Sequence, residues 1–97
     1  MELLFEWDAN KARENLRKHN ISFDEAKTVF NDPLMLTFPD EEHAQDEERL
    51  ISIGLSAKNK LLLVVHLERE ETPEYLLIRL ISCRKATHLE QKAYEEN

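Results

Sequence analysis

The sequence predicts a single α+β domain over residues 1–97, with an antiparallel sheet, two consecutive N-terminal helices and one C-terminal helix. Three observations favour this fold class. Two apolar runs separated by a short acidic segment predict a β-hairpin over residues 61–85. Two helix-start patterns follow each other before residue 33, and a third precedes the C-terminal segment. Consecutive strands joined by short links favour antiparallel pairing.

The chain begins with a short strand and a helix. Leu3, Phe5 and Trp7 alternate with Glu2 and Glu6, which is typical of a short amphipathic strand. Asp8 is suited to cap the first helix, and Asn20 is suited to end it in the left-handed conformation. The apolar face expected for this helix comprises Ala9, Ala12 and Leu16.

A second helix is predicted directly after the first. Ser22 and Glu25 have the spacing of a capping box, and Ile21 with Ala26 has that of a hydrophobic staple. The Asp-Pro pair at 32–33 ends the helix. Its expected buried stripe is Phe23, Ala26, Val29 and Phe30.

The middle of the chain predicts two further strands before the hairpin. Residues 34–38 form the first of them, followed by an acidic loop over 39–48. Residues 51–55 alternate as a second, half-buried strand in which Gly54 is the weak point. At the C-terminus, Thr87 and Glu90 predict another capping box. The helix that follows is expected to dock on the sheet through Leu89 and Ala93.

Composition limits the class of protein. An apolar fraction of 41% suits a globular fold, and a net charge of −7 by itself disfavours a nucleic-acid partner. The longest apolar run, residues 61–65, is far shorter than the ~20 residues of a membrane span. A single cysteine and the lack of a signal-peptide pattern predict a cytoplasmic protein. A single glycine excludes the glycine-rich phosphate and dinucleotide motifs.

The hairpin carries the candidate catalytic residues, because ionisable groups inside apolar strands are costly unless they are paired or functional. They are His66, Glu68, Arg69, Arg79 and Arg84. His66 and Glu68 share one face of the first strand, where a carboxylate could orient the imidazole. The competing interpretation is a histidine hydrogen-bonded beneath a helix, and the pattern alone slightly favours it.

The two strand arginines present a similar choice. Strand alternation places Arg79 and Arg84 on opposite faces unless a bulge intervenes. Arg79 is either a functional residue or the partner of a helix carboxylate such as Glu25. Arg84 and Lys85 could bind either a phosphate or a carboxylate. Lys18 and His19 lie at the end of the first helix, where they interact favourably with the helix dipole. No histidine spacing indicates a metal site.

Many of these positions together resemble one family. The matching segments are Phe5-Glu6-Trp7-Asp8, Lys11, Asn15, Lys18-His19, Ser22-Phe23, Ala26, Phe30, Asp32-Pro33, Glu48-Arg49, Ile53-Gly54, Val65-His66, Glu68-Arg69, Ile81-Ser82 and Arg84-Lys85-Ala86. In order and spacing they are similar to the BrnT-type toxins of bacterial type II toxin–antitoxin pairs. The sequence departs from the family pattern at residues 70–74, where the turn is longer and acidic.

The resemblance implies a RelE-like fold and an endoribonuclease that stops translation. It also implies that His66, Glu68, Arg69, Arg79 and Arg84 lie on or near the functional surface. The RNA-binding residues expected from the resemblance are Lys11, Lys18, His19 and Lys85. The chemistry would be cleavage of RNA by its own 2′-hydroxyl without a metal or cofactor, with the imidazole or carboxylate moving protons and the arginines stabilising charge. A binding module of the same fold, whose arginines only hold an acidic partner, is the alternative.

The resemblance further implies a partner, a BrnA-like antitoxin that covers the toxin and contacts operator DNA on behalf of the complex. The acidic loop 39–48 agrees with a toxin that does not itself touch DNA, since it would repel a duplex. Without its partner, the chain is expected to self-associate through the uncovered apolar surface. The alternative is a stable homodimer formed through a strand edge.

Overall fold

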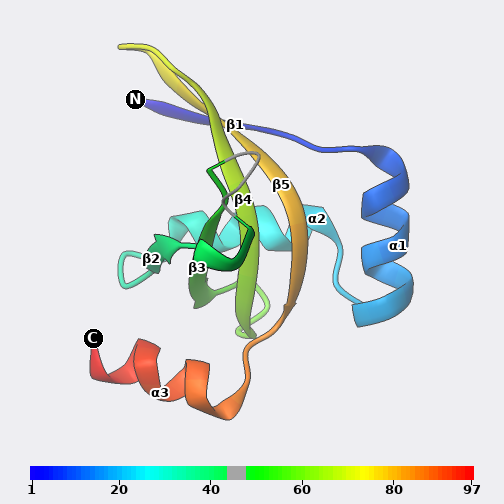
Figure 1. Cartoon of the computed structure of the whole chain (residues 1–97), viewed down its shortest axis with the longest axis vertical. Coiled ribbons are helices and arrows are strands. Elements are labelled where there is room, and N and C mark those ends of the chain that lie inside the picture. The colour runs from blue at the N-terminus through cyan, green and yellow to red at the C-terminus, as the bar shows by residue number, and fades with distance from the viewer. Residues whose placement is uncertain (44–47) are drawn as a thin grey trace.

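The computed structural model describes residues 1–43 and 48–97, and its described strands form one sheet with α2 behind it and α1 packed beside β5 (Figure 1). The strands are β1 (Glu2–Glu6), β2 (Leu36–Pro39), β3 (Leu50–Leu55), β4 (Leu61–Glu71) and β5 (Tyr75–Lys85). The α-helices are α1 (Ala9–His19), α2 (Phe23–Ala26) and α3 (His88–Glu96), and the 3-10 helices are η1 (Lys27–Asn31) and η2 (Glu41–His43). The predicted acidic loop includes residues 44–47, which lie outside the described residues.

The sheet is mixed, so the prediction of an antiparallel sheet is wrong for one pair of strands. In the described chain the strand order is β1-β5-β4-β3-β2. β4 and β5 form the predicted antiparallel hairpin, and β2, β3 and β4 also pair antiparallel. β1 instead runs parallel to β5, with Glu2 opposite Tyr75. These two strands are far apart in sequence, and the tendency of linked neighbours to pair antiparallel does not reach them.

The two N-terminal helices follow each other, but the second is not a regular α-helix. Asp8 caps α1 as predicted, and Asn20 ends it with a φ of 57°. Ser22 Oγ accepts the Glu25 N–H at the start of α2, which is half of the predicted capping box. The other half is missing because the Glu25 carboxylate is buried and binds elsewhere. After Ala26 the chain tightens into η1.

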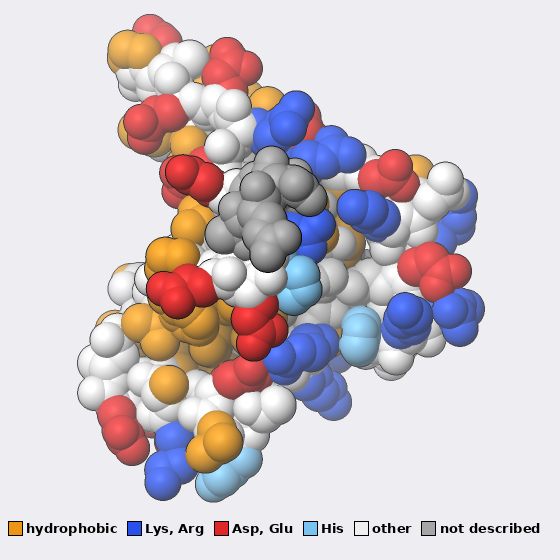
Figure 2. All heavy atoms as spheres, viewed as in Figure 1, with side chains coloured by type: hydrophobic (Ala, Val, Ile, Leu, Met, Phe, Trp, Pro, Cys, Tyr) orange, Lys and Arg blue, Asp and Glu red, His pale blue; other side chains and the backbone are white. Residues whose placement is uncertain are grey.

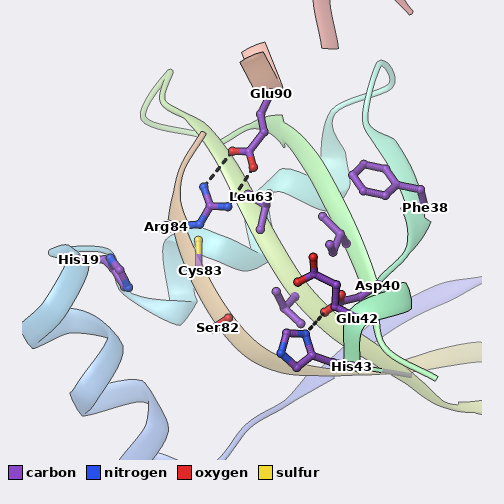
Figure 3. Close-up of a pocket in the computed structure, with 12 residues that line it drawn as sticks. His19, Phe38, Asp40, Glu42, His43, Leu63, Ser82, Cys83, Arg84 and Glu90 are labelled. Atoms are coloured by element: carbon purple, nitrogen blue, oxygen red, sulfur yellow. Dashed lines mark hydrogen bonds and ion pairs between the residues drawn. The ribbon is translucent and has the colours of Figure 1, made fainter. Parts of the chain in front are cut away.

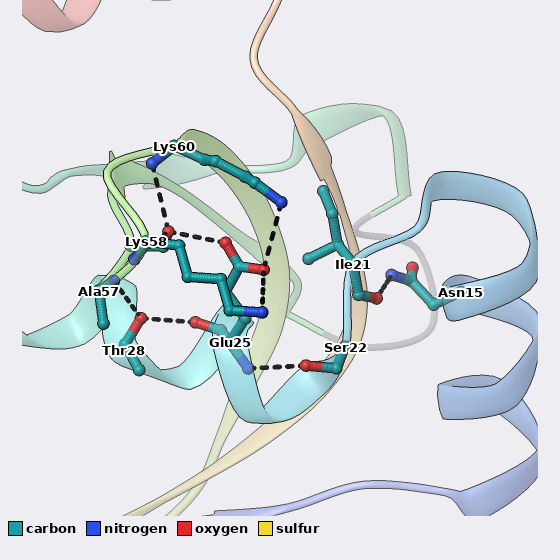
Figure 4. Close-up of polar contacts among 9 residues, drawn as sticks. Asn15, Ile21, Ser22, Glu25, Thr28, Ala57, Lys58 and Lys60 are labelled. Atoms are coloured by element: carbon teal, nitrogen blue, oxygen red, sulfur yellow. Dashed lines mark hydrogen bonds and ion pairs between the residues drawn. The ribbon is translucent and has the colours of Figure 1, made fainter.

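Buried Glu25 ties α2 to the turn between β3 and β4 (Figure 4). Its Oε2 accepts a 2.8 Å hydrogen bond from Ser56 Oγ, and Lys60 Nζ lies 3.8 Å from its Oε1. In the same region Thr28 Oγ1 donates to the Glu25 carbonyl and accepts the Ala57 N–H. A buried carboxylate is tolerated only when it is paired in this way. The contacts therefore fix how α2 and η1 sit behind the sheet.

The main core lies between the sheet and the N-terminal helical segment. It comprises Ile21, Phe23, Ala26, Val29, Leu62, Val64, Ile78, Leu80 and Cys83. The predicted stripe of the second helix is confirmed, with Phe30 packing against this cluster. Gly54 faces η1 so closely that an added Cβ would lie 2.9 Å from Val29 Cγ1. We call the opposite side of the sheet, which carries η2, the cleft face.

The C-terminal helix is attached by polar contacts instead of the predicted apolar ones. Leu89 is 77% exposed and Ala93 is also exposed, so the predicted docking through them is wrong. The predicted capping box at Thr87 is present. Tyr94 donates its hydroxyl hydrogen to Asp32 Oδ2 at 2.6 Å, which raises the pKa of Tyr94 to about 12. None of the described helices is long and apolar enough to span a membrane.

A buried amide, not the predicted apolar face, joins α1 to the sheet. Leu16 is 49% exposed, and of the predicted face only Ala12 packs against the core. Asn15 is buried and bridges two segments: Nδ2 donates to the Ile21 carbonyl at 3.0 Å, and Oδ1 accepts the Cys83 N–H at 2.9 Å. These bonds fix the distance between α1 and β5.

Replacing Asn15 with alanine is expected to lower the free energy of unfolding by about 2–4 kcal/mol, because two buried backbone groups lose their partners. Urea denaturation measures the change. The control is Asn10→Ala on the exposed side of the same helix, which should shift the value by less than about 0.5 kcal/mol. Equal shifts for the two variants would contradict a bridging role for Asn15.

Candidate functional site

A bulge in β5 brings both strand arginines to the cleft face. The register pairs Val65 with Ser82 but His66 with Leu80, so Ile81 is an extra residue in β5. The bulge shifts by one residue the alternation of side chains between the two faces of the sheet. Arg79 and Arg84, five residues apart, therefore point to the same face. Their partners on β4 are four residues apart, Leu67 and Leu63, which places their Cα atoms about 13 Å apart.

A cleft of 380 Å³ lies on this face, bordered by η2, α3 and the end of α1 (Figure 3). Its apolar floor comes from β3 and β4, and Phe38 forms one wall. The lining residues are His19, Phe38, Asp40, Glu42, His43, Ile51, Leu63, Val65, Ser82, Cys83, Arg84 and Glu90. Figure 2 shows Lys, Arg and His side chains gathered in the middle of this face, between the sheet and α1.

Arg84 is the cation in the cleft, and Glu90 of α3 holds it. The guanidinium donates from Nη1 to Glu90 Oε1 at 2.8 Å and from Nη2 to Oε2 at 2.9 Å. This bond raises the pKa of Arg84 and lowers the pKa of Glu90. A bidentate arginine–carboxylate pair has the same geometry as an arginine–phosphate pair. The site is therefore shaped for a planar or tetrahedral oxyanion.

A second cationic cluster lies toward the hairpin tip. Arg79 Nη1 donates to Glu6 Oε2 at 2.8 Å, and Arg69 Nε lies 4.0 Å from the same oxygen. The partner considered from the sequence, Glu25, was wrong, because β1 pairs beside β5 and brings Glu6 opposite Arg79. Two arginines thus share the Glu6 carboxylate here.

The structure places His66 away from the cleft. The side chain is 2% exposed, its Nε2 lies 2.7 Å from Ser52 Oγ, and its ring packs edge-on against Phe30. Burial lowers its pKa to about 4, so the imidazole is neutral near neutral pH. Nδ1 has no hydrogen-bond partner among the described residues, so Glu68 does not orient the ring. The geometry agrees with a structural histidine beneath a helix.

The other candidate residues are spread around the site. Glu68 is exposed beyond the core, beside the second register shift of β4. Lys11 and Lys18 line a neighbouring hollow of 270 Å³ between α1 and β5, and His19 lines both this hollow and the cleft. Lys85 is exposed at the end of β5, two residues after core-facing Cys83, and does not line the cleft. The structure thus groups Arg84 with His19, and Lys11 with Lys18 beside them.

His43 was not among the site residues predicted from the sequence. It lies in η2 at the edge of the cleft, and its Nδ1 is 3.1 Å from Asp40 Oδ2 (Figure 3). The only sequence signal is the three-residue spacing of the Asp40–His43 pair, which has meaning once the intervening turn is known to be helical. Among the described residues, no group of three or more His, Cys, Asp or Glu side chains could hold a metal ion.

The structure thus defines a small mixed α+β domain whose cleft contains two histidines and an arginine paired with a carboxylate. Residues 7–90 match the family described as the ribonuclease toxin BrnT of type II toxin–antitoxin systems, and the chain belongs to this family. Membership implies an antitoxin partner. No curated protein sequence matches the chain.

The fold is similar to the crystal structure of the ribonuclease toxin BrnT from Brucella abortus. The TM-score is 0.64 at 21% sequence identity, and the alignment covers 91% of this chain and 100% of that chain. The predicted resemblance to the BrnT family is confirmed, as is the α+β class.

The burial of His66 predicts a pH-dependent stability. The unfolded state binds a proton below the ordinary pKa of 6.5, whereas the folded state resists protonation down to about 4. The free energy of unfolding should therefore fall as the pH falls through this window, by up to about 3 kcal/mol in total. Above the window the stabilisation is fully present.

The test is urea denaturation across this pH range for the wild type and for His66→Gln, whose amide can still bond Ser52. The variant should lose most of the slope between about pH 6.5 and pH 4. His88→Gln on exposed α3 is the matched control and should keep the wild-type slope. A His66→Gln slope identical to that of the wild type would contradict the assignment.

Proposed function

We propose that this chain is an endoribonuclease that cuts RNA without a metal and thereby stops translation in the bacterial cytoplasm. The observation that carries the proposal is the guanidinium of Arg84 in the cleft, which donates two hydrogen bonds to one carboxylate and could donate the same two to a phosphate. The ribonuclease description of the family supports it. The reaction uses the RNA 2′-hydroxyl as nucleophile, which requires only proton transfer and cations to stabilise the charge on phosphate.

The arginines have separate roles in this proposal. Arg84 binds the phosphate that is cut, in the place that Glu90 occupies in the free protein. Arg79 and Arg69, about 13 Å along the sheet, bind a neighbouring part of the backbone. Lys11, Lys18 and His19 contact the RNA on the other side. A partly exposed carboxylate contributes little to an ion pair and can be displaced by a doubly contacted phosphate.

The burial of His66 removes it from this chemistry, since a group 2% exposed cannot reach a substrate. Glu68 lies outside the cleft, and no Lys or Arg among the described residues forms an ion pair with it. Lys85 also lies outside the cleft lining. The proposal therefore assigns proton transfer to neither His66 nor Glu68.

The decisive variants are Arg84→Gln and Arg79→Gln. Arg84→Gln should reduce cleavage of RNA in excess chelator by about 10²-fold, the usual loss for one donor to a developing oxyanion. Arg79→Gln, farther from the cut phosphate, should cause a smaller loss. Both should relieve growth arrest when the protein is induced alone in a bacterial host, with message integrity followed in parallel.

Arg17→Gln is the charge-matched control, because Arg17 pairs with Glu14 on an exposed part of α1 and lines neither hollow. It should arrest growth and cut RNA like the wild type, and circular dichroism should show all variants folded. A wild-type protein that neither slows growth nor cuts RNA in chelator would defeat the enzyme proposal.

A non-catalytic module that binds acidic protein segments is the second candidate. One observation favours it: both Arg79 and Arg84 already hold carboxylates, which are the groups an acidic segment would offer. The experiment above separates the two functions, since this module would leave RNA intact while still binding its partner.

The partner proposed here is a small, BrnA-like, DNA-binding antitoxin that covers the cleft face. Support comes from Phe38, an exposed aromatic beside the cleft, and from the cations that an acidic segment would neutralise. Glu41 and Glu42 are exposed at the border of this face and would repel a DNA duplex, so operator contacts fall to the antitoxin. Free of its partner, the chain self-associates through the same surface.

Co-expression with the adjacent small reading frame, followed by size-exclusion chromatography, tests the partner. The expected result is a hetero-complex that retards operator DNA, while the purified toxin alone does not. A free chain that stays monomeric and never co-purifies with that neighbour would contradict the proposal, and a stable homodimer with no second component would favour the strand-edge alternative.

A further inference from the structure

The proposed reaction lacks a residue that moves protons. Cleavage by the 2′-hydroxyl needs a base close to the phosphate, and the arginines remain protonated at any relevant pH. Of the two residues considered for proton transfer, His66 is buried on the opposite side of the sheet and Glu68 does not line the cleft. The base must therefore be another group on the cleft face.

Two imidazoles line the cleft, and Figure 3 shows them on opposite sides of Ser82. His19 ends α1, and among the described residues no carboxylate bonds to its side chain to orient the ring. His43 differs, because its Nδ1 lies 3.1 Å from Asp40 Oδ2. A carboxylate that accepts the Nδ1 hydrogen leaves Nε2 as the free acceptor, which is the tautomer a general base requires.

The Asp40–His43 pair is built into the fold. Asp40 is 8% exposed, its N–H donates to the Arg49 carbonyl at 2.9 Å, and its own carbonyl accepts the His43 N–H at 3.2 Å. The bond to Arg49 connects η2 to the residue just before β3. The His43 side chain is 61% exposed, so a substrate can reach Nε2. A fixed carboxylate thus orients an accessible imidazole.

The charges around the pair suit a base that acts on a bound phosphate. The titratable and charged groups facing His43 across the cleft are His19 of α1, Asp40 and Glu42 beside it, Arg84 of β5 and Glu90 of α3. When a phosphate takes the place of Glu90 on Arg84, the remaining carboxylates Asp40 and Glu42 stabilise the imidazolium formed after proton transfer.

We propose that His43 is the general base of the reaction and that Asp40 is its positioning residue; this inference rests on the proposed ribonuclease function. His43 Nε2 takes the proton of the 2′-hydroxyl, the 2′-oxygen forms a bond to phosphorus, and the bond from phosphorus to the 5′-oxygen breaks. The leaving 5′-oxygen takes a proton from water, and the imidazolium returns its proton to the resulting hydroxide. The products are a 2′,3′-cyclic phosphate and a 5′-hydroxyl.

The experiment follows cleavage of a short RNA oligonucleotide by the full-length chain in excess chelator, with mass spectrometry of the products. His43→Gln should lower kcat by about 10²–10³-fold with KM changed by less than about threefold, and it should lose the rise of kcat/KM with pH that an imidazole base gives. Asp40→Asn should lower kcat by about tenfold or more while keeping that pH limb, since the base is still present but poorly oriented.

Two histidine variants serve as controls. His88→Gln on exposed α3 should keep the wild-type rate and pH profile. His19→Gln should raise KM more than it lowers kcat, in line with an RNA contact. Because His43 is exposed, the His43→Gln protein should have the same urea unfolding midpoint as the wild type. Equal midpoints show that the variant is folded.

The outcomes separate the two proposals. A wild-type protein that does not cut RNA overturns the proposed function, and this inference with it. If the wild type cuts RNA but folded His43→Gln keeps its rate and pH limb, the base assignment is wrong while the ribonuclease function stands. Products ending in a 3′-phosphate with no cyclic precursor would also overturn the step described here.

Discussion

The extra residue in β5 is the constraint on which the arrangement of the cleft depends. Before Ile81, alternate residues Ile78 and Leu80 face the core, and after it Cys83 does. Without the bulge, the same alternation would turn Arg84 into the apolar layer beneath the helices, where an unpaired charge is expensive. One added residue thus keeps the core continuous and places both strand arginines on the cleft face.

The net charge of −7 and two arginines on the cleft face are compatible because carboxylates pair with these arginines. Glu90 pairs with Arg84 in the cleft, and Glu6 pairs with Arg79 outside it. These carboxylates orient the guanidinium groups, which lowers the conformational entropy lost when an anion binds. The same pairing explains how arginines persist in strands that are mostly apolar.

Local signals in the sequence predicted the hairpin, the caps at Asp8 and Thr87, and the left-handed end of α1, since each depends on neighbouring residues. Contacts between distant segments were not predictable in this way. The parallel β1–β5 pair, the Glu25–Ser56 bond and the bulge at Ile81 depend on tertiary packing. Leu89 was misjudged because a helix can dock through polar groups at its ends while its apolar residue stays exposed.

The contrast between two histidines shows why residue type did not identify the site. His66 bonds Ser52, whose hydroxyl also lies 2.8 Å from Thr37 Oγ1, so a polar chain that starts in the core links β4, β3 and β2. These bonds stabilise the register in which β2 pairs with β3, and η2 is the next element along the chain. The buried histidine therefore acts through the fold, by setting where the cleft-facing His43 is placed. Burial makes one imidazole a neutral packing group, whereas exposure beside a fixed carboxylate suits the other to proton transfer.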